Sequence, residues 1–205
     1  MLTAEELREC EEARLAYNAE IKRMNEAKMT RKQRGEDEKA YIAWKRWKKA
    51  EVKLKTHGAE SAPDALYSVY SAIYDSLKTT EGMPRLVNLY FMSDWHVQHS
   101  PDAAGVYGYN IIMINKDYYE RHGIDEDVIN TMFHEMVHAA CDMKVPEKKI
   151  KDTDGAFHLL AFQEACERYG GISEYEDAES GYSKTRLPAD RMAKVKDILR
   201  RKGIE

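Results

Sequence analysis

Two histidines and a glutamate occur within the five-residue segment His134-Glu135-Met136-Val137-His138. Residues four apart lie one above the other on a helix, so both imidazoles can reach the same ion. Glu135 is rotated about 100° around such a helix from His134, so it need not bind the metal itself. It can instead accept a proton from a water molecule that zinc has acidified to a pKa of about 7. The segment therefore predicts a zinc-dependent hydrolytic site.

A catalytic zinc normally has three protein ligands and one open position. His158 lies 20 residues after His138 and is followed one helical turn later by Phe162, which can anchor it in the core. Glu164 is the rival ligand, because carboxylates take the third position in many zinc hydrolases. The two candidates lie nearly two turns apart, so both would not easily bind one ion. We expect His158 to be the third ligand.

The elements that must position these groups are two helices. Asp125 can cap the first, which carries the HExxH segment. Asp154 can cap the second, which is expected to run to about Tyr169 and to end at Gly170-Gly171. The first helix has a buried stripe at helical spacing, formed by Ile129, Met132, Phe133, Met136, Val137 and Ala140.

Further elements surround this pair. Another helix is expected from Pro63, with proline in its first turn. Residues 86–92 and 106–114 are two β-prone runs, and the second is a candidate edge strand along which an extended substrate adds. A hairpin is expected near 172–185, followed by a basic helix after Pro188.

Five weaker candidates have plain alternatives. His96 and His99 form an HxxH in an expected loop, where they either line the cleft, bind a second metal or are ordinary polar groups. Asp142 follows His138 by one turn. Its carboxylate either orients the ring of His138 or is simply solvated at the end of the helix. Tyr107 or Tyr109 can face the scissile carbonyl or simply pack on the sheet.

The first part of the chain is expected to be a separate helical hairpin. Thr3 and Glu6 form a capping-box pattern, and apolar residues then recur at helical spacing on both sides of an interruption around Gly35. The sequence therefore divides into an N-terminal arm, residues 1–60, and a second domain, residues 61–205, within an α+β fold.

The arm carries a run of aromatic and basic residues, 44–49, with Lys53 and Lys55 following. Such a run can bind the phosphates or stack on the bases of DNA. Trp44 and Trp47 also fit the buried stripe, which would leave the lysines as a solvated face. The arm could equally recruit a protein partner, so a non-catalytic zinc module that uses it for DNA or protein binding is the alternative function.

Composition restricts the remaining classes. The 205 residues are 33% charged and carry a net charge of −4, of which residues 1–60 contribute +3 (15 basic against 12 acidic). No apolar run approaches the roughly 20 residues that cross a bilayer, so no membrane partner is expected. The opening residues lack an apolar signal core, and the three cysteines are scattered without a CxxC pair. We expect a cytoplasmic chain.

The stretch TMFHEMVHAA, followed by DGAFHLLAFQEACERYG, resembles the SprT-like metallopeptidases, which pair HExxH with a later histidine. The resemblance covers about residues 63–185. It implies a small zincin-like domain that binds one Zn²⁺ per chain. It also implies His134, His138 and His158 as ligands, Glu135 as the base, and a polypeptide substrate; the best-known relatives cleave proteins crosslinked to DNA.

The sequence departs from that family at two points. Leu159 stands where the family usually has glycine, although the ligand before it is retained. Many members also carry a cysteine-rich zinc ribbon, for which these residues offer no cysteine pairs. The chain therefore looks more like the members found in phages and mobile elements.

Overall fold

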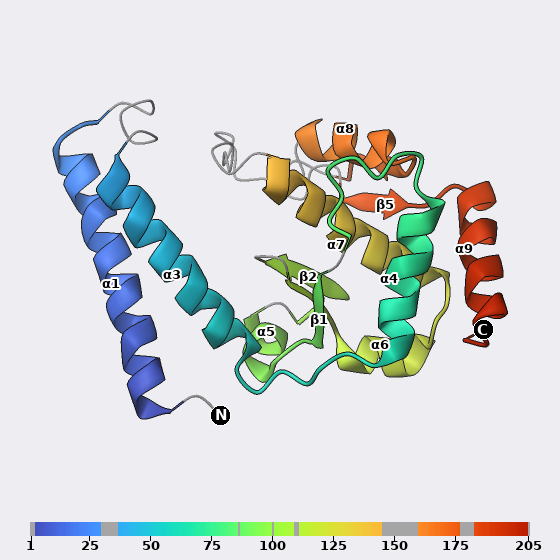
Figure 1. Cartoon of the computed structure of the whole chain (residues 1–205), viewed down its shortest axis with the longest axis horizontal. Coiled ribbons are helices and arrows are strands. Elements are labelled where there is room, and N and C mark those ends of the chain that lie inside the picture. The colour runs from blue at the N-terminus through green and yellow to red at the C-terminus, as the bar shows by residue number, and fades with distance from the viewer. Residues whose placement is uncertain are drawn as a thin grey trace. The chain divides into compact units, whose positions relative to one another are not determined.

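The computed structural model describes residues 3–29, 37–85, 87–99, 101–108, 111–144, 160–176 and 183–204. Helices and two small sheets make it a mixed α+β structure, as the sequence predicts (Figure 1). The helices are α1 (Ala4–Glu26), α3 (Glu38–Thr56), α4 (Asp64–Ser76), α5 (Asp94–His99), α6 (Lys116–His122), α7 (Glu126–Lys144), α8 (Leu160–Arg168) and α9 (Ala189–Arg201). The strands are β1 (Asn88–Phe91), β2 (Gly105–Gly108), β3 (Ile111–Ile114), β4 (Ile172–Glu174) and β5 (Lys184–Arg186).

The chain forms two compact units. The smaller unit comprises Met1–Ala59 and Ser93–His96, and the larger unit comprises Glu60–Met92 and Val97–Glu205. Each has an apolar core of its own. Among the described residues, no helix is both long and apolar enough to span a membrane.

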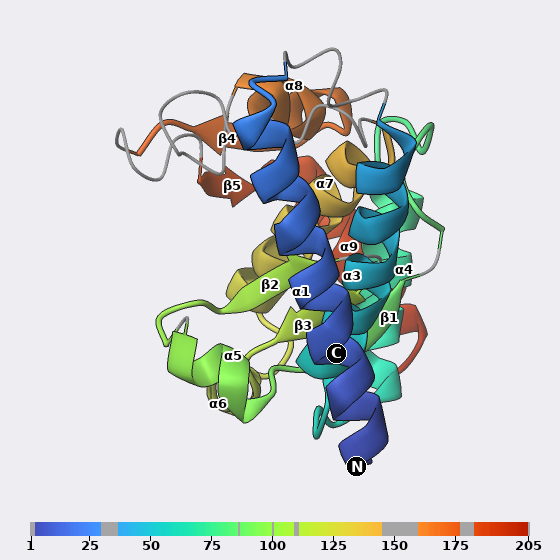
Figure 2. The ribbon, with the colours of Figure 1, turned by 90° about the vertical axis from the view of Figure 1, so that its left-hand side faces the viewer.

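The smaller unit is built on α1 and α3, which lie side by side in opposite directions (Figure 2). Thr3 caps α1 in the expected capping box, in which its hydroxyl accepts from the Glu6 amide and Glu6 accepts from the Thr3 amide. Cys10 and Ala13 of α1 pack against Ala50 of α3 in a small core. The interruption predicted around Gly35 lies outside the described residues.

The three-stranded sheet of the larger unit has the strand order β1-β3-β2, in which β1 and β3 are parallel and β2 is antiparallel to β3. One β-prone run was expected over 106–114, and this expectation is wrong, because the run contains two strands. Gly108 and Asn110 are residue types that favour a turn, but tyrosine, valine and isoleucine on both sides of them favour strands, and the expectation of a single run followed the latter. All four residues of β3 are buried, as its central position requires.

Helix α7 occupies the centre of the larger unit, where it contacts α4, α8, β2, β3 and β5. The Asp125 carboxylate accepts hydrogen bonds from the amides of Asp127 and Val128 and so caps α7, as expected. Every residue of the predicted stripe is buried, with at most 1% of its surface exposed. The 172–185 hairpin is confirmed as β4 and β5, and the helix after Pro188 as α9.

Two smaller expectations need correction. Pro63 is the N-cap residue of α4 and does not lie in its first turn. The segment with His96 and His99 was expected to be a loop and instead forms α5. A six-residue helix is too short for apolar periodicity to identify it.

Candidate metal centre

Helix α7 brings His134 and His138 together one turn apart. Their Nε2 atoms lie 3.1 Å apart, and their rings meet edge to face with centroids separated by 4.8 Å. Two nitrogens bound tetrahedrally to zinc, each at 2.0–2.1 Å, would be separated by about 3.3 Å. Both imidazoles therefore already have the spacing that a shared zinc ion requires, with little rearrangement of either ring.

The ring of His134 is held from a second element. Nδ1 of His134 lies 2.8 Å from the hydroxyl oxygen of Thr185, which belongs to β5. When Nδ1 donates its proton to that oxygen, Nε2 keeps the lone pair that a metal binds. The same hairpin is fixed again two residues later, because the Leu187 amide donates to the Asn130 side chain of α7 at 2.9 Å. Strand β5 thus supports the face of α7 that carries His134.

Glu135 is a buried carboxyl group, with 4% of its surface exposed. Burial away from water raises its pKa to about 8, because desolvation disfavours the charged form. A bound cation nearby would oppose this effect by favouring the carboxylate. The position suits a base that must be shielded from bulk water and become charged only beside a metal.

Strand β2 approaches Glu135 closely because its first residue is glycine. A Cβ atom at Gly105 would lie 3.2 Å from Cγ and 3.3 Å from Oε1 of Glu135, and only 2.9 Å from Cγ2 of Thr131. These separations are tight or impossible for real side chains. The backbone at the start of β2 therefore lies directly against the candidate base.

A cleft of about 490 Å³ opens beside these groups. Its lining includes His134 and Glu135 from α7, Gly105 from β2 and Thr185 from β5. Tyr118 of α6 also contributes to the lining. One cleft thus collects the candidate ligand, the candidate base and the edge strand.

Helix α8 reaches the centre through Phe162, which is 4% exposed. The ring centroid of Phe162 lies 5.0 Å from that of His134 and 4.6 Å from that of His138. His158, the expected third ligand, lies outside the described residues. Glu164 is exposed and lies two positions after Phe162, about 200° around the helix, so it faces away from the imidazoles. This geometry disfavours the rival ligand.

The structure describes only some of the weaker candidate residues, and none of those described lines the cleft. Tyr107 packs against the main core, which agrees with the plain reading of that residue, and Tyr109 is outside the described residues. His96 is buried and its Nδ1 lies 2.9 Å from the Ser93 hydroxyl. The side chains of His99 and Asp142 also lie outside the described part of the chain.

Another cluster of metal-ligating types lies between α6 and α7. Single ligand atoms of His122, Asp125 and Asp127 lie within 4.8 Å of one another. Asp125 already caps α7, and its carboxylate lies 2.9 Å from Nδ1 of His122. This arrangement has a structural role without a metal.

Sequence reasoning missed two contributors to the centre, Thr185 and Gly105. Thr185 meets His134 only through tertiary packing. Phe162 was expected to be a core anchor, and it is buried against both imidazoles. Gly105 has no local signal beyond being glycine at the start of a β-prone run. Comparison with protein-family models, with curated proteins and with solved structures found no match for this chain.

Proposed function

We propose that the larger unit is a zinc-dependent metallopeptidase with a zincin-like fold, as the resemblance to the SprT-like family implies. The observation that carries the proposal is the 3.1 Å separation of the His134 and His138 Nε2 atoms, with a buried carboxyl group on the residue between them in sequence. Imidazole nitrogens are preferred zinc ligands, and the HExxH arrangement supplies a base beside them.

His158 is the proposed third ligand. It precedes the first residue of α8 by two positions in the sequence, and α8 packs Phe162 against both imidazoles. Phe162, four residues after His158 in the sequence, therefore lies beside both imidazoles. Glu164 faces away, so histidine is the better candidate.

The chain's own groups provide the rest of the chemistry. Zinc, when bound, supplies a Lewis acid that lowers the pKa of water to about 7. Glu135 accepts the proton of the attacking water and then delivers it to the leaving amide nitrogen. Thr185 holds the ring of His134, and the buried position of Glu135 excludes competing solvent.

The proposed substrate is an extended polypeptide. Strand β2 is the edge of its sheet, since β3 is its one partner strand among the described residues. An extended peptide can pair with such an edge through backbone hydrogen bonds. Because β2 begins against Glu135, a peptide paired with it would pass the base with its backbone.

The proposed compartment is the cytoplasm. Cys10 and Cys166 are buried free thiols. Free thiols are stable in a reducing environment.

Glu135→Gln is the decisive variant, because glutamine keeps the shape of the side chain and cannot take the proton. We expect zinc content to stay at one per chain while hydrolysis of casein falls by about 10²–10⁴-fold. Glu120→Gln, at an exposed position of α6, is the matched control and should keep the wild-type rate. Equal rates for wild type and Glu135→Gln would reject Glu135 as the base. Zinc-loaded wild type that cleaves neither casein nor itself would favour the non-catalytic zinc module.

A further inference from the structure

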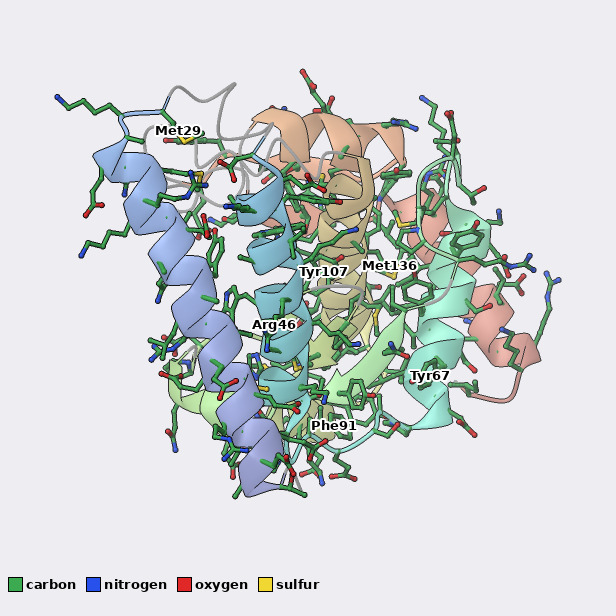
Figure 3. All side chains as sticks on the ribbon, turned by 60° about the vertical axis from the view of Figure 1, so that its left-hand side comes forward. Met29, Arg46, Tyr67, Phe91, Tyr107 and Met136 are labelled. Carbon is green, nitrogen blue, oxygen red and sulfur yellow. The ribbon has the colours of Figure 1, made fainter. Side chains whose placement is uncertain are left out.

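Helix α3 carries a dense row of positive charge. Its residues 39–49 include five lysines and arginines and no acidic residue. Four of these side chains are described, and all are exposed: Lys39, Lys45, Arg46 and Lys49. Figure 3 marks Arg46 on this helix. Lysine side chains are usually exposed, so exposure alone does not indicate a binding surface. The groups around these charges must therefore be considered.

The four exposed cations of α3 differ in their partners from the cations of α1, whereas Lys53, further along α3, pairs with Glu6 at 3.7 Å. Each cation of α1 faces a carboxylate, in the pairs Arg8–Glu5 (3.8 Å), Arg14–Glu11, Lys22–Glu26 (3.8 Å), and Arg23 with both Glu20 and Asp37 (2.6 Å each). Among the described residues, none of the four exposed cations of α3 forms an ion pair. Lys45 instead lies 4.8 Å above the ring of Tyr41. Within the described part of the arm, no carboxylate pairs with these four positive charges.

The spacing of these charges suits a polyanion with closely repeated charges. The four residues extend over about 15 Å of helix, and Lys45 and Lys49 are separated by about 6 Å along the axis. Duplex DNA carries one negative charge per about 1.7 Å of its axis. Several phosphates can therefore face this row at once.

We propose that the face of α3 formed by Lys39, Lys45, Arg46 and Lys49 binds the phosphate backbone of nucleic acid without selecting a base sequence. The face contains no residue of the metal centre, so the proposal stands independently of peptidase activity. Lysines and arginines that neutralise phosphates release counterions, which supplies the binding free energy.

An anionic membrane fits this face less well. A membrane-surface helix needs an apolar face to enter the lipid. The apolar side of α3 packs against α1 through Ala50 and Trp47. On the exposed side, the large apolar residues described are Tyr41 and Ile42, and Lys45 covers the Tyr41 ring.

The test compares two triple variants of the full chain. Lys45→Gln/Arg46→Gln/Lys49→Gln removes charges from the α3 face, and Arg8→Gln/Arg14→Gln/Lys22→Gln removes paired charges from α1. Both change the formal net charge from −4 to −7, since each loses three cations. Fluorescence anisotropy measures binding to a labelled random-sequence DNA duplex as salt is increased, and circular dichroism checks that helix content is unchanged.

We expect the wild-type affinity to fall steeply with salt. The α3 variant should bind about tenfold or more weakly, and the slope of log affinity against log salt should fall by up to about 3. The α1 variant should stay within about twofold of wild type. Equal losses in both variants would mean that only net charge matters and would overturn the proposal. So would absence of duplex binding, including the case in which phosphatidylserine vesicles are bound instead.

Discussion

Thr185 lies 51 residues from His134 in the chain, yet its hydroxyl oxygen is 2.8 Å from the Nδ1 atom of that imidazole. A strand of the second sheet therefore contacts the ring of a proposed zinc ligand on the central helix. Groups that orient a metal-binding histidine typically change metal affinity by about 10–100-fold when removed.

Thr185→Val keeps the side-chain shape and removes the hydrogen-bond acceptor. We expect zinc affinity, measured by competition with a chelator, to fall by about 10–100-fold, and Thr185→Ser to restore it. Thermal unfolding of the zinc-free protein should change by much less. If Thr185→Val binds zinc as tightly as wild type, the hydroxyl does not orient His134.

Gly105→Ala tests the close approach of β2 to the base. The added methyl group would lie 2.9 Å from Cγ2 of Thr131 and 3.2 Å from Cγ of Glu135, so the strand or these side chains must shift. We expect overpacking to cost about 1–3 kcal/mol of stability, and the peptidase rate to fall while zinc is retained. Adding Thr131→Ser removes the nearest methyl group and should recover part of the loss. No change in unfolding or rate would show that the two elements can separate freely.

His158→Ala and Glu164→Gln distinguish the two candidates for the third ligand. We expect His158→Ala to lose zinc affinity by orders of magnitude, as should His134→Ala and His138→Ala. Glu164→Gln should retain one zinc per chain, because this side chain faces away from the imidazoles. Elemental analysis decides the question, and zinc loss in Glu164→Gln alone would reverse the assignment.

A chain that begins at Glu60 should fold and bind zinc. The apolar core of the larger unit draws all of its buried residues from Ala62 to Leu199, so none comes from the arm. We expect the thermal midpoint of the zinc-bound form to remain within about 5 °C of the full chain. The segment Ser93–His96 belongs to the same compact unit as the arm. The shortened chain would lack the other residues of that unit, so we expect a small loss of thermal stability. A shortened chain that fails to fold would make the arm part of the core.

Asp37 gives the smaller unit a pH dependence. Its carboxylate accepts from Arg23 at 2.6 Å and from the Ala40 amide at 2.9 Å, and these bonds, with Arg23 the largest contributor, lower its pKa. The contribution to stability is complete above the ordinary aspartate pKa of about 3.9 and is lost as the pH falls through the lower folded-state value. Carboxyl NMR titration should show the pKa of Asp37 rising in Arg23→Gln. An unchanged pKa would show that the ion pair does not form.

Periodic patterns carried most of the correct predictions. The stripe from Ile129 to Ala140 recurs at helical spacing over several turns, so the helix and its buried face follow from the sequence. Asp125 and Thr3 were predicted as caps because a side-chain acceptor at a helix start satisfies amides that otherwise have no partner.

The errors arose where the structure depends on tertiary packing, or on elements too short to show a pattern in the sequence. Gly108 and Asn110 are turn-favouring residue types, but the valine, tyrosine and isoleucine around them favour strands, so the run from Val106 to Ile114 was expected to be a single element. Helix α5 is shorter than two turns. The hairpin carrying Thr185 was predictable, but its contact with His134 depends on how β5 packs on α7. The approach of Gly105 to Glu135 likewise follows from the position of β2 in the sheet.

The tryptophans, which are natural fluorescent probes of unfolding, are distributed unequally between the two units. All three tryptophans, Trp44, Trp47 and Trp95, belong to the smaller unit. Tryptophan emission therefore follows the unfolding of the smaller unit more closely than that of the unit with the candidate metal centre. Far-ultraviolet circular dichroism, in contrast, follows the helices of both units. Any gap between the two melting curves then measures how far the chain departs from two-state unfolding.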